Sequence, residues 1–130
     1  MTPELPAFFE SYLAGYVAKD CDGIARHFAE PCMICDSNGC HVVRGTVDAR
    51  TYLDDFLSSL RNAGCTRIPF QILSEANAGE DGLFCSTRTF IERDDGVRLG
   101  DMEYHYCLER GANSLLIRFA RMGTVRSWNL

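Results

Sequence analysis

The hydrophobic pattern of this sequence changes character at Gly64, and that change limits the possible folds more than any other feature. Before Gly64, apolar residues recur every three or four positions, which indicates amphipathic helices. After Gly64, apolar and polar residues alternate and turn residues separate the runs, which indicates strands. Helices followed by a meander of strands are typical of an α+β fold, with the helices packed on one face of an antiparallel sheet.

Two long amphipathic helices are predicted in the first half. The first runs from Leu5 to Ala18, and the second begins at a cap formed by Thr46 or Asp48 and ends at Gly64. The apolar stripe of the second helix consists of Tyr52, Leu53, Phe56, Leu57 and Leu60. Each helix therefore has one face to bury in a core.

A short helix and a hairpin are predicted between the two long helices. Asp20 caps the short helix and Pro31 prevents it from continuing. Its inner face is formed by Ile24, Ala25 and Phe28. The hairpin joins a strand from Cys32 to Asp36 with an extended segment from Cys40 to Val43, through the turn Ser37-Asn38-Gly39.

Four strands are predicted in the second half. They run from Arg67 to Ala76, from Gly82 to Arg93, from Arg98 to Arg110 and from Ser114 to Val125. In the third of these strands, polar residues alternate with Met102, Tyr104, Tyr106 and Leu108. The aromatic side should therefore meet the helices, and the polar side should lie on the opposite face.

Size and charge exclude several kinds of partner. A chain of 130 residues is near the usual size of one domain, so a single domain over residues 1–130 is expected. The net charge of −5 and the scattered basic residues argue against nucleic-acid binding. The sequence has no apolar run of membrane-spanning length and no signal-peptide pattern, so a soluble cytoplasmic protein is expected, without a membrane partner.

The seven cysteines are expected to be free thiols, because a cytoplasmic environment keeps them reduced. Cys32 and Cys35 have the spacing of half a zinc site. Residues three apart in a strand point to opposite faces, however, and no second cysteine or histidine pair follows. No metal site is therefore predicted.

Several local motifs resemble a known superfamily. They are Tyr12-Leu13-Ala14-Gly15-Tyr16, the segment from Asp20 to Glu30, the strand that ends in Asp36, and Val43-Arg44-Gly45 before the next helix. In this order the chain resembles the nuclear transport factor 2-like superfamily, which includes SnoaL-like polyketide cyclases, ketosteroid isomerases and scytalone dehydratases. The resemblance implies a curved sheet that forms a cone around an apolar pocket, with no metal or organic cofactor. It also implies a homodimer through the outer face of the sheet, where Phe84, Phe90 and Cys107 would suit a partner surface.

The same resemblance assigns three candidate catalytic residues. Asp36 falls where ketosteroid isomerases carry their general base, and Tyr12 falls where they carry the tyrosine of the oxyanion hole. Tyr104 falls where they place a protonated aspartic acid, and this departure argues against steroid isomerisation itself. A carboxylate beside an apolar cavity can accept a carbon-bound proton, and a tyrosine hydroxyl can stabilise the resulting enolate. The pocket is expected to be lined by Tyr16, His27, Phe56, Met102 and Tyr106.

Structural interpretations stand beside these functional ones. Asp36 is also a good turn-opening residue, and Tyr12 and Tyr16 also fit an apolar helical stripe as core residues. The dehydratase interpretation is weaker, because only His27 and His41 offer histidines near the pocket. Several arginines of the second half are expected to form cross-strand charge pairs, and they are Arg88, Arg98, Arg118, Arg121 and Arg126. An arginine that faced the cavity would instead imply a carboxylate-bearing ligand.

Three functions remain open on this evidence. The first is a cofactor-independent isomerase, cyclase or dehydratase that acts by proton transfer on a small apolar or carbonyl-bearing molecule. The second is a binding module that carries or senses such a molecule in the same pocket. The third is an interaction domain whose cone is filled by its own side chains, among them Phe8, Phe56, Phe70 and Tyr104.

Overall fold

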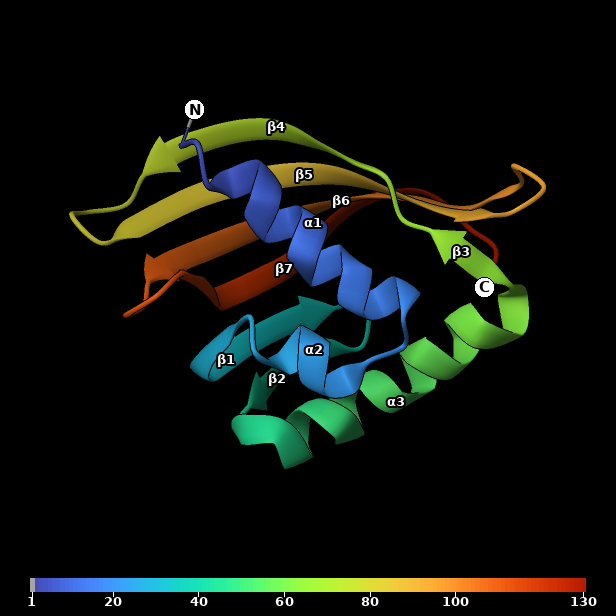
Figure 1. The fold of residues 1–130 in the computed structure, drawn as a ribbon, viewed down its shortest axis with the longest axis horizontal. Coiled ribbons are helices and arrows are strands. Elements are labelled where there is room, and N and C mark those ends of the chain that lie inside the picture. Colours follow the sequence, from blue (N-terminus) through green and yellow to red (C-terminus); the bar gives the residue numbers. More distant parts are fainter. Residues whose placement is uncertain (1) are drawn as a thin grey trace.

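In the computed structural model, which describes residues 2–130, three helices lie against one face of a curved sheet (Figure 1). In chain order the elements are α1 (Leu5–Val17), α2 (Cys21–Ala25), β1 (Phe28–Asp36), β2 (Gly39–Val43), α3 (Gly45–Ala63), β3 (Cys65–Arg67), β4 (Phe70–Asn77), β5 (Gly82–Arg93), β6 (Arg98–Arg110) and β7 (Leu115–Trp128). The predicted α+β class is confirmed. None of the helices within the described residues is long and apolar enough to cross a membrane.

The sheet is mixed, whereas the sequence predicts an antiparallel one. Its strand order is β2-β1-β7-β6-β5-β3, and β4 also pairs with β5. The meander β5-β6-β7 is antiparallel, but β1 runs parallel to β7. A parallel pair needs a long connection, and the whole segment between β1 and β7 supplies it here. This pairing places the β1–β2 hairpin at one edge of the sheet, beside β7.

The short helix α2 ends earlier than predicted. Asp20 caps it as expected, since its carboxylate accepts a hydrogen bond from the Gly23 N–H. Phe28 does not belong to the helix but begins β1, so Pro31 lies inside a strand and is not what ends the helix. The register of β1 against β7 shifts between Phe28 and Met33, and such an irregularity tolerates a residue without an N–H.

The long helix α3 begins at Gly45, with Arg44 as its N-cap residue, so neither predicted cap is correct. The Asp48 carboxylate instead accepts a hydrogen bond from the Arg44 N–H at 2.9 Å, from within the first turn. The C-terminal end is as predicted, because Gly64 adopts the left-handed conformation with a φ of 80°.

The strand boundaries agree with the sequence pattern for β5 and β6 and differ elsewhere. The predicted strand from Arg67 to Ala76 is divided into β3 and β4 by Ile68 and Pro69, and proline cannot donate a hydrogen bond to a neighbouring strand. The last strand extends three residues past Val125, to Trp128. This extension brings the C-terminal end of β7 to the same side of the sheet as α3.

The core lies between α1 and the inward face of the sheet. The alternation predicted for β6 is confirmed, because Met102, Tyr106 and Leu108 are buried on this face. Phe9 of α1 is also buried, and its ring centroid lies 5.0 Å from that of Tyr106. Helices α1 and α2 approach closely at Gly15, where an added Cβ would lie only 2.8 Å from Cγ1 of Ile24.

The outer face of the sheet carries a row of apolar side chains. Phe84, Cys107, Phe119 and Met33 are successive cross-strand neighbours on β5, β6, β7 and β1. Residues paired across strands share a face. Phe84 is 54% exposed and Met33 is 40% exposed, which makes the row an accessible apolar surface. We call these four residues the outer row.

Phe90, which the sequence places on the same partner surface, is buried instead. The guanidinium groups of Arg88 and Arg98 lie 5.0 and 4.0 Å from the centre of its ring. Arg88 pairs with Asp101 and Arg98 pairs with Glu92. These ion pairs hold both guanidinium groups over the Phe90 ring.

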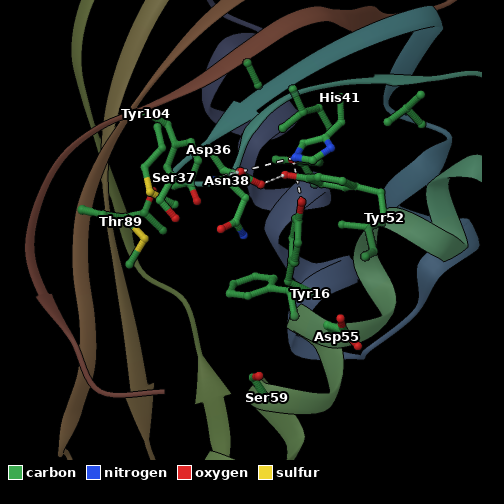
Figure 2. A pocket seen from close by; sticks show the side chains of 18 of the residues that line it. Tyr16, Asp36, Ser37, Asn38, His41, Tyr52, Asp55, Ser59, Thr89 and Tyr104 are labelled. Carbon is green, nitrogen blue, oxygen red and sulfur yellow. Dashed lines mark hydrogen bonds and ion pairs between the residues drawn. The ribbon is translucent and has the colours of Figure 1, made fainter.

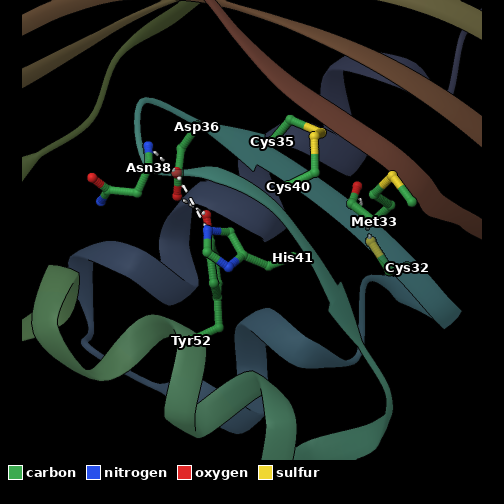
Figure 3. Close-up of a disulfide and its surroundings, with 8 residues drawn as sticks. All are labelled: Cys32, Met33, Cys35, Asp36, Asn38, Cys40, His41 and Tyr52. Atoms are coloured by element: carbon green, nitrogen blue, oxygen red, sulfur yellow. Dashed lines mark hydrogen bonds and ion pairs between the residues drawn. A yellow bond between two sulfur atoms is a disulfide. The ribbon is translucent and has the colours of Figure 1, made fainter.

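The prediction of seven free thiols is wrong, because Cys35 and Cys40 form a disulfide. The two residues are directly opposite in the β1–β2 hairpin, a proximity that the count of cysteines does not reveal. In Figure 3 the disulfide and the His41 ring project from opposite faces of this hairpin. The cysteines that remain free are Cys21, Cys32, Cys65, Cys85 and Cys107.

Candidate functional site

A cavity of about 730 Å³ opens between α1, α3 and the inward face of the sheet. This cavity argues against a cone that is filled by its own side chains. Of the residues expected to fill the cone, Phe56 and Tyr104 line the cavity, and Phe8 and Phe70 pack elsewhere in the core. All the tyrosines of the chain line this cavity, namely Tyr12, Tyr16, Tyr52, Tyr104 and Tyr106. The cavity is therefore apolar in its walls and carries several hydroxyl groups.

Asp36 reaches the cavity from the end of β1, and three groups hold its carboxylate (Figure 2). The Tyr52 hydroxyl donates to Oδ2 at 2.8 Å, and the Asn38 N–H donates to Oδ1 at 2.8 Å. Nε2 of His41 lies 3.4 Å from Oδ1. The turn-opening bond predicted for Asp36 is thus present, and the same carboxylate also lines the cavity.

These contacts determine the charge of Asp36. Partial burial by itself would raise the pKa of the carboxyl group, but the hydrogen bonds from Tyr52, the Asn38 N–H and His41 outweigh it and lower the pKa. Burial and the bond to Asp36 raise the pKa of Tyr52. At neutral pH the site therefore contains an ionised carboxylate bound to a neutral phenol.

Tyr12 and Tyr16 form a hydroxyl pair on α1. Their hydroxyl oxygens are 2.8 Å apart, and either can be the donor. Burial, as the largest cause, raises the pKa of both phenols. Tyr12 lines the cavity as predicted, but its hydroxyl is engaged with Tyr16 and makes no hydrogen bond to Asp36 among the described residues.

Tyr104 presents its hydroxyl group at the wall of the cavity. It makes no hydrogen bond with any residue in the described range 2–130. Burial and, after it, the negative charge of Asp36 raise the pKa of Tyr104, so the phenol stays neutral near that carboxylate. In Figure 2 it extends from the sheet wall on the same side as Asp36. Tyr104 and Asp36 thus line one cavity.

The residues expected to line the pocket lie in two places. Tyr16, Phe56, Met102 and Tyr106 line the cavity. His27 lies outside it, because α2 ends early and the imidazole turns back towards α1.

There the His27 ring bridges two helices. Nδ1 contacts the Gly23 carbonyl oxygen at 2.9 Å and Nε2 contacts the Ser11 hydroxyl at 2.9 Å. Burial lowers the pKa of His27. The geometry gives this histidine a role in joining α1 to α2 rather than in the cavity.

The sequence pattern does not indicate Tyr52 or Trp128 as site residues, and it gives His41 no role in the site. Tyr52 appears in the sequence only as one member of an apolar stripe, and its bond to Asp36 depends on the angle at which α3 crosses the hairpin. Trp128 lies beyond the predicted end of its strand, and its ring stacks on Phe56 with centroids 5.7 Å apart. His41 faces the cavity because it pairs with the inward residue Ile34.

No lysine or arginine within residues 2–130 lines the cavity. The ion pairs Arg88–Asp101, Arg118–Glu109 and Arg126–Glu103 agree with the predicted cross-strand pairing. The ionisable groups that do line the cavity, tyrosines aside, are Asp36, His41, Asp48 and Asp55. The described residues contain no group of three or more metal-ligating side chains placed to hold an ion.

Solved structures share this fold over nearly the whole chain. An NTF2-like protein of unknown function from Shewanella oneidensis is 12% identical, with a TM-score of 0.72 over 95% of this chain and 98% of that one. A ketosteroid isomerase-like protein from Erwinia carotovora is 16% identical, with a TM-score of 0.68 over 98% and 99%. Aln2 from Streptomyces is 15% identical, with a TM-score of 0.71 over 94% and 91%. At such identities the likeness shows the fold alone.

The sequence itself matches one family. None of the curated proteins matches the chain. A family model described as NTF2-like protein (DUF6841) matches residues 3–123, which is most of the chain. This agrees with the resemblance noted in the helical half and with the fold of the sheet. The chain therefore belongs to this family of NTF2-like proteins.

Proposed function

We propose that the cavity binds a small carbonyl compound and that Asp36 removes a proton from a carbon atom next to the carbonyl group. The observation that carries the proposal is the pair formed by Asp36 and Tyr104 around one cavity. Asp36 is an ionised carboxylate, and Tyr104 is a neutral phenol whose hydroxyl has no partner among the described residues. These are the two groups that enolisation requires, a proton acceptor and a hydrogen-bond donor for the oxyanion.

The proposed reaction has two proton-transfer steps. An oxygen of the Asp36 carboxylate takes the proton, and the electron pair of the broken C–H bond forms the C=C bond of an enolate. The carbonyl oxygen takes the negative charge and accepts a hydrogen bond from the Tyr104 hydroxyl. Return of the same proton to a different carbon atom gives an isomer and restores the carboxylate.

The lowered pKa of Asp36 limits the substrates. A weakly basic carboxylate removes a proton efficiently only where the carbon acid is itself activated. A carbon between a carbonyl group and a C=C bond meets this condition. We therefore take a β,γ-unsaturated ketone as the substrate class, and cyclohex-3-en-1-one as the probe, because its conjugated product absorbs in the ultraviolet.

Binding without chemistry is the second candidate function, and one observation favours it. The Asp36 carboxylate already accepts bonds from Tyr52 and Asn38, which reduces its readiness to take a further proton. The two functions differ in the assay. Proton transfer requires that enone formation accelerate in proportion to protein concentration, whereas a binding module changes the fluorescence of Trp128 and leaves the rate at that of buffer.

The variant Tyr104→Phe tests the donor. We expect a loss of about 100-fold in the rate of enone formation, because one donor to the developing oxyanion is removed. Its dissociation constant for the ketone should remain within a few-fold, measured through Trp128, the single tryptophan of the chain. An unchanged rate with unchanged binding would remove Tyr104 from the proposed mechanism.

We also propose that the outer row is the contact face with a second copy of the chain. It is exposed at Phe84 and Met33, and the ion pairs Arg118–Glu109 and Arg126–Glu103 balance both signs of charge on the central strands β6 and β7. Two copies can therefore face each other without like-charge repulsion.

The variant Phe84→Asp tests this face. It should sediment as a monomer at a concentration at which the unmodified protein sediments as a dimer, because the change places a charge in an apolar contact. Val47→Asp serves as the control, since Val47 is 77% exposed on α3 and lies away from the sheet. A monomeric unmodified protein, or a dimer that persists in Phe84→Asp, would contradict the proposal.

A further inference from the structure

We infer that the cavity selects an organic cation, namely a molecule in which an amine or quaternary ammonium group is attached to an apolar body. The inference rests on the part of the proposed function that makes the cavity a ligand site, and it does not depend on proton transfer. Three features of the cavity carry it: the sign of its charges, the neutrality of their partners and the arrangement of its aromatic rings.

The charges that line the cavity are of one sign. Asp36, Asp48 and Asp55 contribute carboxylates, and no lysine or arginine from the described part of the chain lines the cavity. A cleft with apolar walls concentrates the field of such charges and raises the local concentration of ions of the opposite sign. The three aspartates therefore favour a cationic ligand over an anionic one.

The contacts of Asp36 and Asp48 leave their charge largely unneutralised. Asp36 is held by a tyrosine hydroxyl and a backbone N–H, and Asp48 by the N–H of Arg44, all of which are neutral donors. Only His41 can supply a positive charge, and its Nε2 lies 3.4 Å from the Asp36 carboxylate. Within residues 2–130 the Asp55 side chain forms no ion pair. A cationic ligand would therefore add a positive charge that these contacts lack.

The aromatic rings form an unbroken chain around the same space. The rings follow one another in the order Trp128, Phe56, Tyr16, Tyr12, Tyr106 and Tyr104, with centroids 5.7, 5.8, 5.2, 6.4 and 6.0 Å apart. All six residues line the cavity. Burial raises the pKa of the four tyrosines, so they remain neutral rings. A cation over the face of such a ring is attracted by its quadrupole, most strongly for tryptophan and tyrosine.

A matched pair of probes separates charge from shape. N,N,N-trimethylanilinium and tert-butylbenzene have the same size and outline, and only the first is charged. We expect the cation to bind about tenfold more tightly than its neutral isostere at low ionic strength, measured by the fluorescence of Trp128. Benzoate, as the anionic probe, should bind more weakly than either, and the preference for the cation should decrease as salt is added.

Two variants link the preference to the cavity. Asp36→Asn should weaken binding of the cation several-fold and leave binding of tert-butylbenzene unchanged. Asp95→Asn is the matched control, because Asp95 also bonds a backbone N–H two residues further on but lies in the β5–β6 turn, outside the cavity. It should change neither affinity.

The outcomes distinguish this inference from the proposed function. Equal affinities for the cation and its isostere, or a cation affinity that Asp36→Asn leaves unchanged, would overturn the selection of cations. Neither result would bear on proton transfer, which the rate of enone formation tests separately. A tenfold preference that Asp36→Asn removes would support the inference even if no ketone were turned over. Absence of binding by the cation at millimolar concentration would overturn it directly.

Discussion

The variant Asp36→Asn is expected to lower the rate of enone formation by about 10²- to 10⁴-fold, the usual contribution of a general base. An amide cannot take up the substrate proton at neutral pH, so the first step fails. The amide oxygen can still accept the hydrogen bond from the Asn38 N–H, and the amide NH2 in place of Oδ2 can donate to the Tyr52 hydroxyl oxygen, so the hairpin and the cavity should keep their shape. The rate is read from the absorbance of the conjugated enone, and folding from the circular dichroism of the variant.

The control for this change is Asp95→Asn, which removes a carboxylate from a comparable turn outside the cavity and should retain the full rate. The pH dependence gives a second check. Because the pKa of Asp36 is lowered, the base should stay ionised, and the rate of the unmodified protein should hold as the pH falls from 7 to about 5. A variant Asp36→Asn with the full rate would show that another group is the base.

Leu108→Ala is expected to lower the free energy of unfolding by about 2–5 kcal/mol. Leu108 is fully buried in β6, between its cross-strand neighbours Leu83 and Ile117, which are also buried. The change removes apolar contacts and leaves a cavity that the surrounding strands cannot fill. Because domains are stable by only about 5–15 kcal/mol, this loss should be evident as a large shift of the urea midpoint.

Leu73→Ala provides the comparison, since Leu73 also lies in a strand but is 46% exposed. Its effect on the free energy of unfolding should be below about 1 kcal/mol, because less apolar surface returns to water. Similar losses for the two variants would contradict the placement of the core between α1 and β6.

The sequence predicts those parts of the fold that depend on local pattern. The bounds of β5 and β6, the inward face of β6 and the end of α3 at Gly64 all follow from alternation and from a single glycine. The parallel pairing of β1 with β7 could not be predicted in this way, because it joins residues that are distant in the chain. The Cys35–Cys40 disulfide depends on the register of the hairpin, which the number of cysteines does not indicate.

The same distinction between local pattern and packing applies to the residues of the candidate site. Asp36 and Tyr104 are candidates through the resemblance to ketosteroid isomerases, and both line the cavity. The bond from Tyr52 to Asp36 depends on how α3 crosses the hairpin, and that angle is set by packing. The imidazole of His27, which is expected in the pocket, lies outside the cavity and contacts the Ser11 hydroxyl on α1.

The most direct test of the site is a carbon NMR titration of the Asp36 carboxyl group in the free protein. We predict a pKa below the ordinary aspartate value of 3.8. In Tyr52→Phe the pKa should rise towards that value, because the variant loses the donor that does most to stabilise the ionised form. A pKa at or above 3.8 in the unmodified protein, or one that Tyr52→Phe leaves unchanged, would contradict the hydrogen-bonded Asp36 carboxylate on which the site is built.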